Sequence, residues 1–256
     1  MFFRALMVAV FLAPALGAAQ SNPVLVKIIQ DVQTAYNKQE RPVVVFDTDG
    51  TILDNRPRTL FILSEFAKQK AYVTPEAAQR LANITLPMVQ YRLPDTLNTI
   101  GITEPAVVNN AAAFWGERFF SSEYLRHDIP TPGAVDFLRR LYSSGARIIY
   151  VSGRDLPRQF LGTTRSLYEL GFPIGIQGTE LAMKPTTQTQ DAIFKQQVTT
   201  YLRVSGKVVA TFDNEPVNAN VYRRAFADAT VVLYQAPHTP NPPPLLPNIV
   251  TVASFQ

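Results

Sequence analysis

Residues 41–51 of the chain read RPVVVFDTDGT. The apolar run 43–46 is continuous and rich in β-branched residues, which is typical of a strand buried on both faces of a parallel sheet. The run ends at Asp47 and Asp49, which stand two residues apart before a glycine. Two carboxylates at the end of a buried strand are costly in free energy unless a site compensates their charge. This stretch therefore predicts a central strand with a functional site at its carboxyl end, in preference to a simple Asp-Gly turn.

The flanking sequence alternates between strand and helix patterns. Further strand candidates lie at residues 147–151, 174–177, 207–212 and 230–234. Helical patterns lie at residues 23–37, 132–144, 157–170, 191–204 and 217–227. Strands that alternate with helices predict a parallel sheet covered on both faces, so the expected fold class is α/β, with a Rossmann-like three-layer α/β/α sheet. The proline-rich tail that begins at Ala236 is expected to form an irregular strap, followed by a short strand at 249–252.

The interval between the first two strands breaks this alternation. Residues 55–130 are mostly helical in pattern, for example at 60–70, 75–83 and 106–120. An insertion at this point would lie above the carboxyl end of the first strand, where ligands bind in such sheets. We therefore expect an α/β core formed by residues 20–54 and 131–256 and a helical cap formed by residues 55–130.

The amino-acid composition limits the kinds of catalytic and metal sites that the chain can form. The chain has 256 residues, of which 46% are hydrophobic, and it has no cysteine, which excludes disulfides, thiolate zinc sites and a cysteine nucleophile. With two histidines, a histidine-rich metal site is not expected, so a metal would have to bind oxygen ligands, as Mg²⁺ does. The net charge of +4 is spread along the chain without a Lys/Arg block, which predicts a solvated basic surface rather than a nucleic-acid interface.

The first nineteen residues have the pattern of a signal peptide. Arg4 supplies a positive start, residues 6–12 form a short apolar run, and the small residues Gly17 and Ala19 precede an expected cut after Ala19. The run is shorter than the roughly 20 residues that a membrane span needs. We therefore expect a periplasmic or secreted protein with no stable membrane association after cleavage.

Four motifs along the chain resemble those of the haloacid dehalogenase superfamily, in the same order. Residues 46–54, FDTDGTILD, are similar to its first motif, and residues 151–154, VSGR, to its second. Lys184, within the sequence MKP, is similar to motif three, and residues 212–215, FDNE, to motif four. The resemblance covers about residues 43–234. It implies the fold of that superfamily, with a helical cap between motifs one and two, and the chemistry of its phosphatases.

The resemblance also implies a role for each acidic residue. A carboxylate at the position of Asp47 attacks phosphorus and forms an aspartyl phosphate. Asp49 protonates the leaving oxygen and then deprotonates the attacking water. Mg²⁺ would be held by the carboxylates of Asp47 and Asp213 and by the backbone carbonyl of Asp49, because an anionic nucleophile needs a cation to approach a phosphate.

The expected phosphate ligands are Thr51, Ser152, Gly153 and Lys184. Lys184 would offset the charge of Asp47 and of the transferring group, and Thr51 is equally well placed to satisfy a local backbone group. Motif four departs from the common pattern, because Val217 stands where many relatives carry a second aspartate. Asn214 or Glu215 could hold a metal-bound water in its place.

The expected function is Mg²⁺-dependent hydrolysis of small phosphate monoesters through an aspartyl phosphate, with a small phosphorylated substrate as the partner. An aspartate at position 49 favours phosphate-ester chemistry over dehalogenation. Two alternatives stay open: a phosphotransferase, which differs from a hydrolase in the exclusion of water, and a non-catalytic module that binds a phosphorylated ligand. The sequence does not identify the ester.

Overall fold

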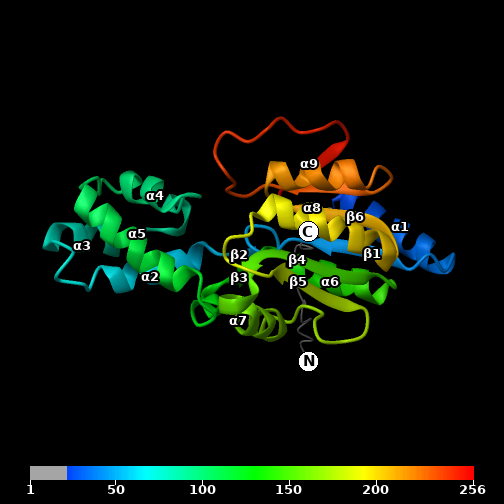
Figure 1. Ribbon diagram of the computed structural model, residues 1–256, viewed down its shortest axis with the longest axis horizontal. Coiled ribbons are helices and arrows are strands. Elements are labelled where there is room, and N and C mark those ends of the chain that lie inside the picture. The colour runs from blue at the N-terminus through cyan, green and yellow to red at the C-terminus, as the bar shows by residue number, and fades with distance from the viewer. Residues whose placement is uncertain (1–21) are drawn as a thin grey trace, which may run out of the picture.

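The computed structural model describes residues 22–256, so the predicted signal peptide lies outside the described residues. Strand β1 (Pro42–Phe46) lies inside a six-stranded sheet in the order β5-β4-β1-β6-β7-β8 (Figure 1), in which every neighbouring pair is parallel. The other strands are β4 (Arg147–Asp155), β5 (Thr179–Lys184), β6 (Lys207–Asp213), β7 (Thr230–Tyr234) and β8 (Ile249–Val252). All of β1 is buried, which confirms the predicted central strand.

Helices cover both faces of this sheet. Helices α1 (Pro23–Asn37) and α6 (Ala134–Ser143) pack in one hydrophobic cluster, and α8 (Asp191–Ser205) and α9 (Pro216–Ala225) pack in a second cluster on the other face. Helix α7 (Leu156–Glu169) follows β4. The predicted three-layer α/β/α arrangement is confirmed. Among residues 22–256, no helix is both long and apolar enough to cross a bilayer.

One predicted strand is wrong. Residues 174–177 are irregular, and the strand lies at β5, which pairs with β4 alone and ends at Lys184. An edge strand buries little of its surface, and only Met183 of β5 is fully buried. It therefore lacks the continuous apolar run that marks a central strand, whereas residues 172–174 are apolar because they pack against the core from a loop.

The segment between β1 and β4 is helical, as expected. It contains α2 (Arg56–Phe66), α3 (Pro75–Ala82), α4 (Leu93–Thr99) and α5 (Pro105–Phe119), with short 3₁₀ helices η1 (Leu86–Met88) and η2 (Tyr124–His127). It has a hydrophobic cluster of its own. The chain leaves along β2 (Leu53–Asp54) and returns along β3 (Ile129–Pro130), which pair antiparallel. We call residues 55–130 the helical segment; Figure 1 shows it beyond the carboxyl ends of the strands.

The proline-rich tail forms the expected irregular strap, followed by β8. We call residues 235–248 the strap. Asn220 fixes its far end, because its side-chain amide donates to the carbonyl of Pro244 at 2.9 Å and accepts from the backbone N–H of Leu246 at 2.8 Å. Prolines cannot donate backbone hydrogen bonds, and the side chain of Asn220 in α9 bonds to the strap backbone here.

Candidate active site

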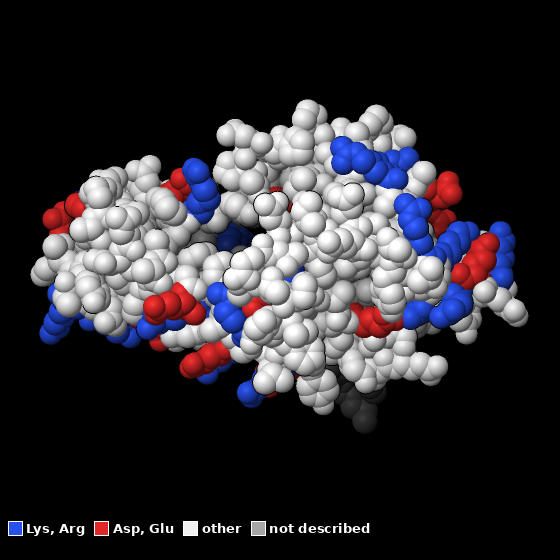
Figure 2. All heavy atoms as spheres, viewed as in Figure 1, with Lys and Arg blue, Asp and Glu red and all other residues white. Residues whose placement is uncertain are grey.

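The carboxyl ends of β1, β4 and β6 bring the predicted motifs together. Asp47 directly follows β1, and its N–H donates to the carbonyl of Phe212 in β6 at 2.9 Å. The hydroxyls of Thr48 and Ser152 lie 2.5 Å apart, which joins the loop after β1 to β4. A cavity of about 1070 Å³ opens above them between the core and the helical segment. Figure 2 shows the surface hollowed there, with basic side-chain atoms at the bottom of the hollow.

Lys195 is the cation beside the predicted nucleophile. Its Nζ lies 2.6 Å from Asp47 Oδ1 and 2.6 Å from Asp213 Oδ2, and its side chain is 2% exposed. Lys184 instead pairs with Asp191 at 2.7 Å on the rim of the cavity. Lys195, a buried lysine of α8, therefore lies where Lys184 was expected to offset the charge of Asp47, and the role of Lys184 toward phosphate stays a prediction.

The sequence carries a signal for Lys195 that lies outside the four motifs. Lys195, Thr199 and Leu202 are spaced four and three residues apart in the predicted helix 191–204, and all three are buried. Such spacing places them on one face of a helix. A lysine on the buried face of a helix is rare unless it is paired with a carboxylate.

The pKa values of Asp47 and Lys195 are both shifted by burial and by the charges around them. Burial raises the pKa of Asp47 to about 7, with Lys195 opposing the shift and Asp213 adding to it. Burial alone would lower the pKa of Lys195, but the carboxylates of Asp213 and Asp47 outweigh burial and raise it well above its ordinary value. Lys195 therefore stays an ammonium at neutral pH and carries the charge that compensates the two carboxylates.

Asp49 faces two arginines rather than Asp47. Arg154 donates to both of its carboxylate oxygens, at 2.9 and 2.7 Å, and Arg58 donates to Oδ1 at 2.7 Å. Asp128 accepts from the same two guanidinium groups, at 2.8 Å from Arg58 and 2.6 Å from Arg154. Arg58 and Asp128 belong to the helical segment and the other two residues to the core, so this charge-balanced cluster ties the two parts together.

The arginines determine the charge of Asp49. Burial raises the pKa of Asp49, but the guanidinium groups of Arg154 and Arg58 outweigh burial and hold its pKa well below the usual range. In this conformation Asp49 is therefore a carboxylate, the form that can take a proton from water.

The predicted phosphate ligands divide into two groups. Gly153 and Lys184 line the cavity. Thr51 and Ser152 are fully buried, and their hydroxyls bond within the protein, with Thr51 donating to Asp47 Oδ2 at 3.1 Å and Ser152 bonding to Thr48. These two hydroxyls therefore bond within the protein around Asp47, and their role as phosphate ligands stays a prediction.

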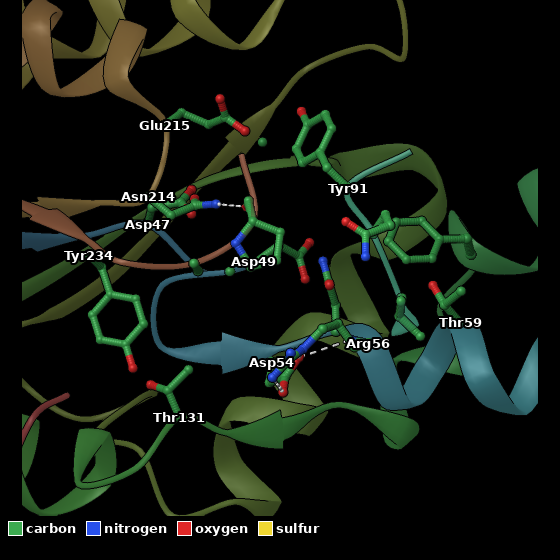
Figure 3. Close-up of a pocket in the computed structure, with 18 of the residues that line it drawn as sticks. Asp47, Asp49, Asp54, Arg56, Thr59, Tyr91, Thr131, Asn214, Glu215 and Tyr234 are labelled. Atoms are coloured by element: carbon green, nitrogen blue, oxygen red, sulfur yellow. Dashed lines mark hydrogen bonds and ion pairs between the residues drawn. The ribbon is translucent and has the colours of Figure 1, made fainter. Parts of the chain in front are cut away.

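The polar residues that directly follow β6 contact the strap. The amide of Asn214 donates to the carbonyl of Pro237 at 2.8 Å, and Glu215 accepts from the N–H of Thr239 at 3.1 Å, so both side chains hold the strap. Figure 3 shows Asn214 beside Asp47 and Glu215 nearby at the edge of the pocket. Asn218, which the sequence analysis did not select, donates to Asp213 Oδ1 at 3.2 Å and leaves its own buried carbonyl oxygen without a partner among the described residues.

Gly50 allows the loop after β1 to approach the side chain of Asn214 closely. Its φ is +75°, and a Cβ there would lie 2.5 Å from Nδ2 of Asn214.

Gly175 has a similar φ of +72° with nothing within 4 Å of its Cβ position. We expect Gly175→Ala to lower the free energy of unfolding by about 1 kcal/mol through backbone strain alone. Gly50→Ala should cost more and also lower turnover, because Asn214 must move. Urea unfolding of both variants measures the difference, and equal losses would show that the Gly50–Asn214 contact imposes no constraint.

No family model matches the sequence, and no curated protein sequence matches it significantly. Solved structures do match. Protein Tyrosine Kinase A of Mycobacterium tuberculosis is similar with a TM-score of 0.54 at 15% identity, over 84% of this chain and 94% of that one. A protein of Clostridium difficile assigned as a phosphatase has a TM-score of 0.52 at 14% identity, over 75% and 84%.

A third similar structure is a HAD-superfamily hydrolase of Geobacter sulfurreducens, with a TM-score of 0.50 at 13% identity, over 84% of this chain and 92% of that one. The chain has the haloacid dehalogenase fold. Identities this low establish the fold and no more. Within that fold, residues of the expected motifs one, two and four lie around one cavity, and the buried Lys195 contacts Asp47 there.

Proposed function

We propose that this protein is a phosphatase that hydrolyses phosphate monoesters through an aspartyl phosphate on Asp47, with Mg²⁺ as cofactor. The observation that carries the proposal is the setting of Asp47. It is a buried carboxylate at a strand end that lines a large cavity and bonds to a buried ammonium beside a second aspartate. The hydrolase and phosphatase names of two structures with the same fold support the same chemistry.

In the first step an oxygen of Asp47 would form a bond to phosphorus while the bond from phosphorus to the ester oxygen breaks. The electron pair of that bond leaves with the ester oxygen, which needs a proton. Lys195 would keep the attacking group and its partner Asp213 from repelling the phosphate, because one ammonium contacts both carboxylates at 2.6 Å. Hydrolysis of the aspartyl phosphate then regenerates Asp47 and releases phosphate.

Asp49 is the proposed proton carrier for both steps. The arginine pair favours its carboxylate, which is the form required to deprotonate water in the second step. Donation of a proton to the leaving oxygen requires the neutral acid. We infer that the acid forms when at least one guanidinium contact to Asp49 is released, for example by a movement of the helical segment that withdraws Arg58.

The oxygen donors around Asp47 fit a hard cation. Asp47 and Asp213 offer carboxylate oxygens, the backbone carbonyl of Asp49 follows in the same loop, and the unpartnered carbonyl oxygen of Asn218 is buried beside Asp213. Over residues 22–256, no three His, Cys, Asp or Glu side chains gather as a metal site, and the carboxylate of Asp49 is bonded to Arg154 and Arg58. A bound Mg²⁺ would supply positive charge to the phosphoryl oxygens.

The test is phosphate release from p-nitrophenyl phosphate by the purified protein. We expect turnover with Mg²⁺, loss of turnover with a chelator, and recovery when Mg²⁺ is returned. Turnover that is insensitive to chelation would contradict the metal requirement. Nitrophenol formed in excess of phosphate, with phosphate appearing on an added alcohol, would identify a phosphotransferase. Binding of inorganic phosphate without turnover of any monoester would favour the binding module.

A further inference from the structure

The cavity above Asp47 has an aromatic wall on the helical segment. Trp115, Phe119 and Phe120 lie at the end of α5, and Tyr91 lies between η1 and α4; all four line the same cavity as Asp47. Phe120 is 37% exposed and Tyr91 46% exposed. Large aromatic side chains left open at a cavity wall indicate a surface that a ligand covers.

The rings of this wall are held in place before any ligand binds. Trp115 stacks on Phe119 with ring centroids 4.3 Å apart, and its indole N–H donates to Thr59 at 3.1 Å. Arg58 covers the Phe119 ring at 4.1 Å. Phe120 packs edge-on against both rings, at 5.8 and 5.1 Å. A fixed wall costs little conformational entropy when a ligand binds to it.

Tyr91 is held across the mouth of the cavity. Its phenol oxygen accepts a hydrogen bond from the hydroxyl of Thr239 in the strap at 2.9 Å, which links the helical segment to the core. Figure 3 shows Tyr91 and Tyr234 on opposite sides of the pocket, with Asp49 between them in that view. The space between the aromatic wall and the loop that carries Asp47 and Asp49 is therefore bounded by the core, the strap and the helical segment.

The outer part of the cavity has no unpaired cation among the described residues. Arg56 makes two bonds to Asp54, at 2.8 and 2.7 Å. Arg92 makes two bonds to Asp95, at 2.7 and 3.0 Å. Lys184 pairs with Asp191. A second phosphate or a carboxylate on the substrate would therefore have to compete for a cation that is already neutralised.

We propose that the phosphate monoester used by this protein has a leaving group with a planar ring system, aromatic or heteroaromatic, that binds against the wall of Trp115, Phe119, Phe120 and Tyr91. This inference rests on the proposed phosphatase function. A cavity of about 1070 Å³ has room for a nucleoside or aryl group beyond the phosphate. Ring stacking on aromatic side chains selects planar groups and needs no free charge.

A matched pair of esters tests the proposal. Adenosine 5′-monophosphate and ribose 5-phosphate are both esters of a primary alcohol, and the second lacks the base. We expect kcat/KM to be about tenfold higher for the nucleotide, as stacking of one base provides. Phe120→Ala should lower kcat/KM about tenfold for the nucleotide and leave that for ribose 5-phosphate nearly unchanged. Phe160→Ala is the control, because Phe160 is 41% exposed and lies outside the cavity lining.

Binding can be followed without turnover, because Trp115 is the only tryptophan of the chain. Saturable quenching of its fluorescence by adenosine, with no effect of ribose, is the expected result. Quenching together with no hydrolysis of any ester would refute the phosphatase while supporting the ring site. Hydrolysis of both esters with equal kcat/KM, or an equal effect of Phe120→Ala on both, would refute the ring site and leave the phosphatase standing.

Discussion

Asp47→Asn is expected to lower kcat for a phosphate monoester by at least about 10⁴-fold, since the loss of a catalytic nucleophile has effects of that order. Asparagine has nearly the same shape, but its amide cannot attack phosphorus at a useful rate. The fold should persist, because Lys195 can keep the one remaining side-chain oxygen of residue 47 as its acceptor, and the hydroxyl of Thr51 can accept from the new amide N–H. The measurement is kcat with p-nitrophenyl phosphate, together with acid-quenched trapping of labelled phosphoenzyme, which should be present in the wild type and absent in the variant.

Asp54→Asn is the matched control for this prediction. Asp54 also lines the cavity, but its carboxylate is occupied by Arg56. We expect this variant to keep activity of the same order as the wild type and to form phosphoenzyme. Phosphoenzyme in Asp47→Asn would refute the assignment of the nucleophile, whatever the residual rate.

The second large effect is expected from Lys195→Met. Removal of the ammonium leaves Asp47 and Asp213 buried and close together without compensation, and breaking a buried ion pair from one side typically costs about 3–5 kcal/mol of stability. Without Lys195 the pKa of Asp47 should rise further, because burial and Asp213 then act unopposed. The nucleophile would then be protonated over more of the neutral range, and any remaining activity should shift to higher pH. Urea unfolding and a pH profile of kcat measure the two effects.

Lys184→Met tests which lysine, Lys184 or Lys195, compensates the charge of Asp47. Lys184 pairs with an Asp191 side chain that is 53% exposed, so its loss should cost less than about 1 kcal/mol. We expect most of the activity to remain. Lys195→Arg keeps the charge and serves as the control for folding if Lys195→Met does not fold. Loss of activity in Lys184→Met with activity retained in Lys195→Met would restore Lys184 to the role predicted from its motif.

An ion-pair cluster connects the helical segment directly to Asp49, the proposed proton carrier. Its members are Arg58, Arg154, Asp49 and Asp128. Its cross-links join Arg58 to Asp49 and Asp128 to Arg154, so any movement of the helical segment about β2 and β3 changes the charges around Asp49. Buried ion pairs with several bonds define one relative position well. Position and protonation of Asp49 are therefore coupled through the same four side chains.

Local patterns in the sequence predicted most of the strands, helices and layers of the fold. The run before Asp47 predicted the central strand, because burial on both faces requires continuous apolar residues. The alternation of strand and helix patterns predicted the three layers, and the helical pattern of 55–130 predicted the segment above the strand ends. The acidic pair after β1 and Asp213 at the end of β6 were also predicted to lie close together, since parallel strands carry their carboxyl ends to one edge of the sheet.

The partners of those residues were decided only by the tertiary structure. Lys195 lies 148 positions from Asp47, and Arg154 lies 105 positions from Asp49, and no local pattern specifies such pairs. The sequence motif selected Lys184 because it follows the expected order, but the packing of α8 against the sheet presents Lys195 to the carboxylates instead. Sequence periodicity indicated most of the buried residues and most of the elements, β5 excepted. The three-dimensional packing of those elements determined which buried charges meet, because a buried charge is stable only where an opposite charge is brought to it.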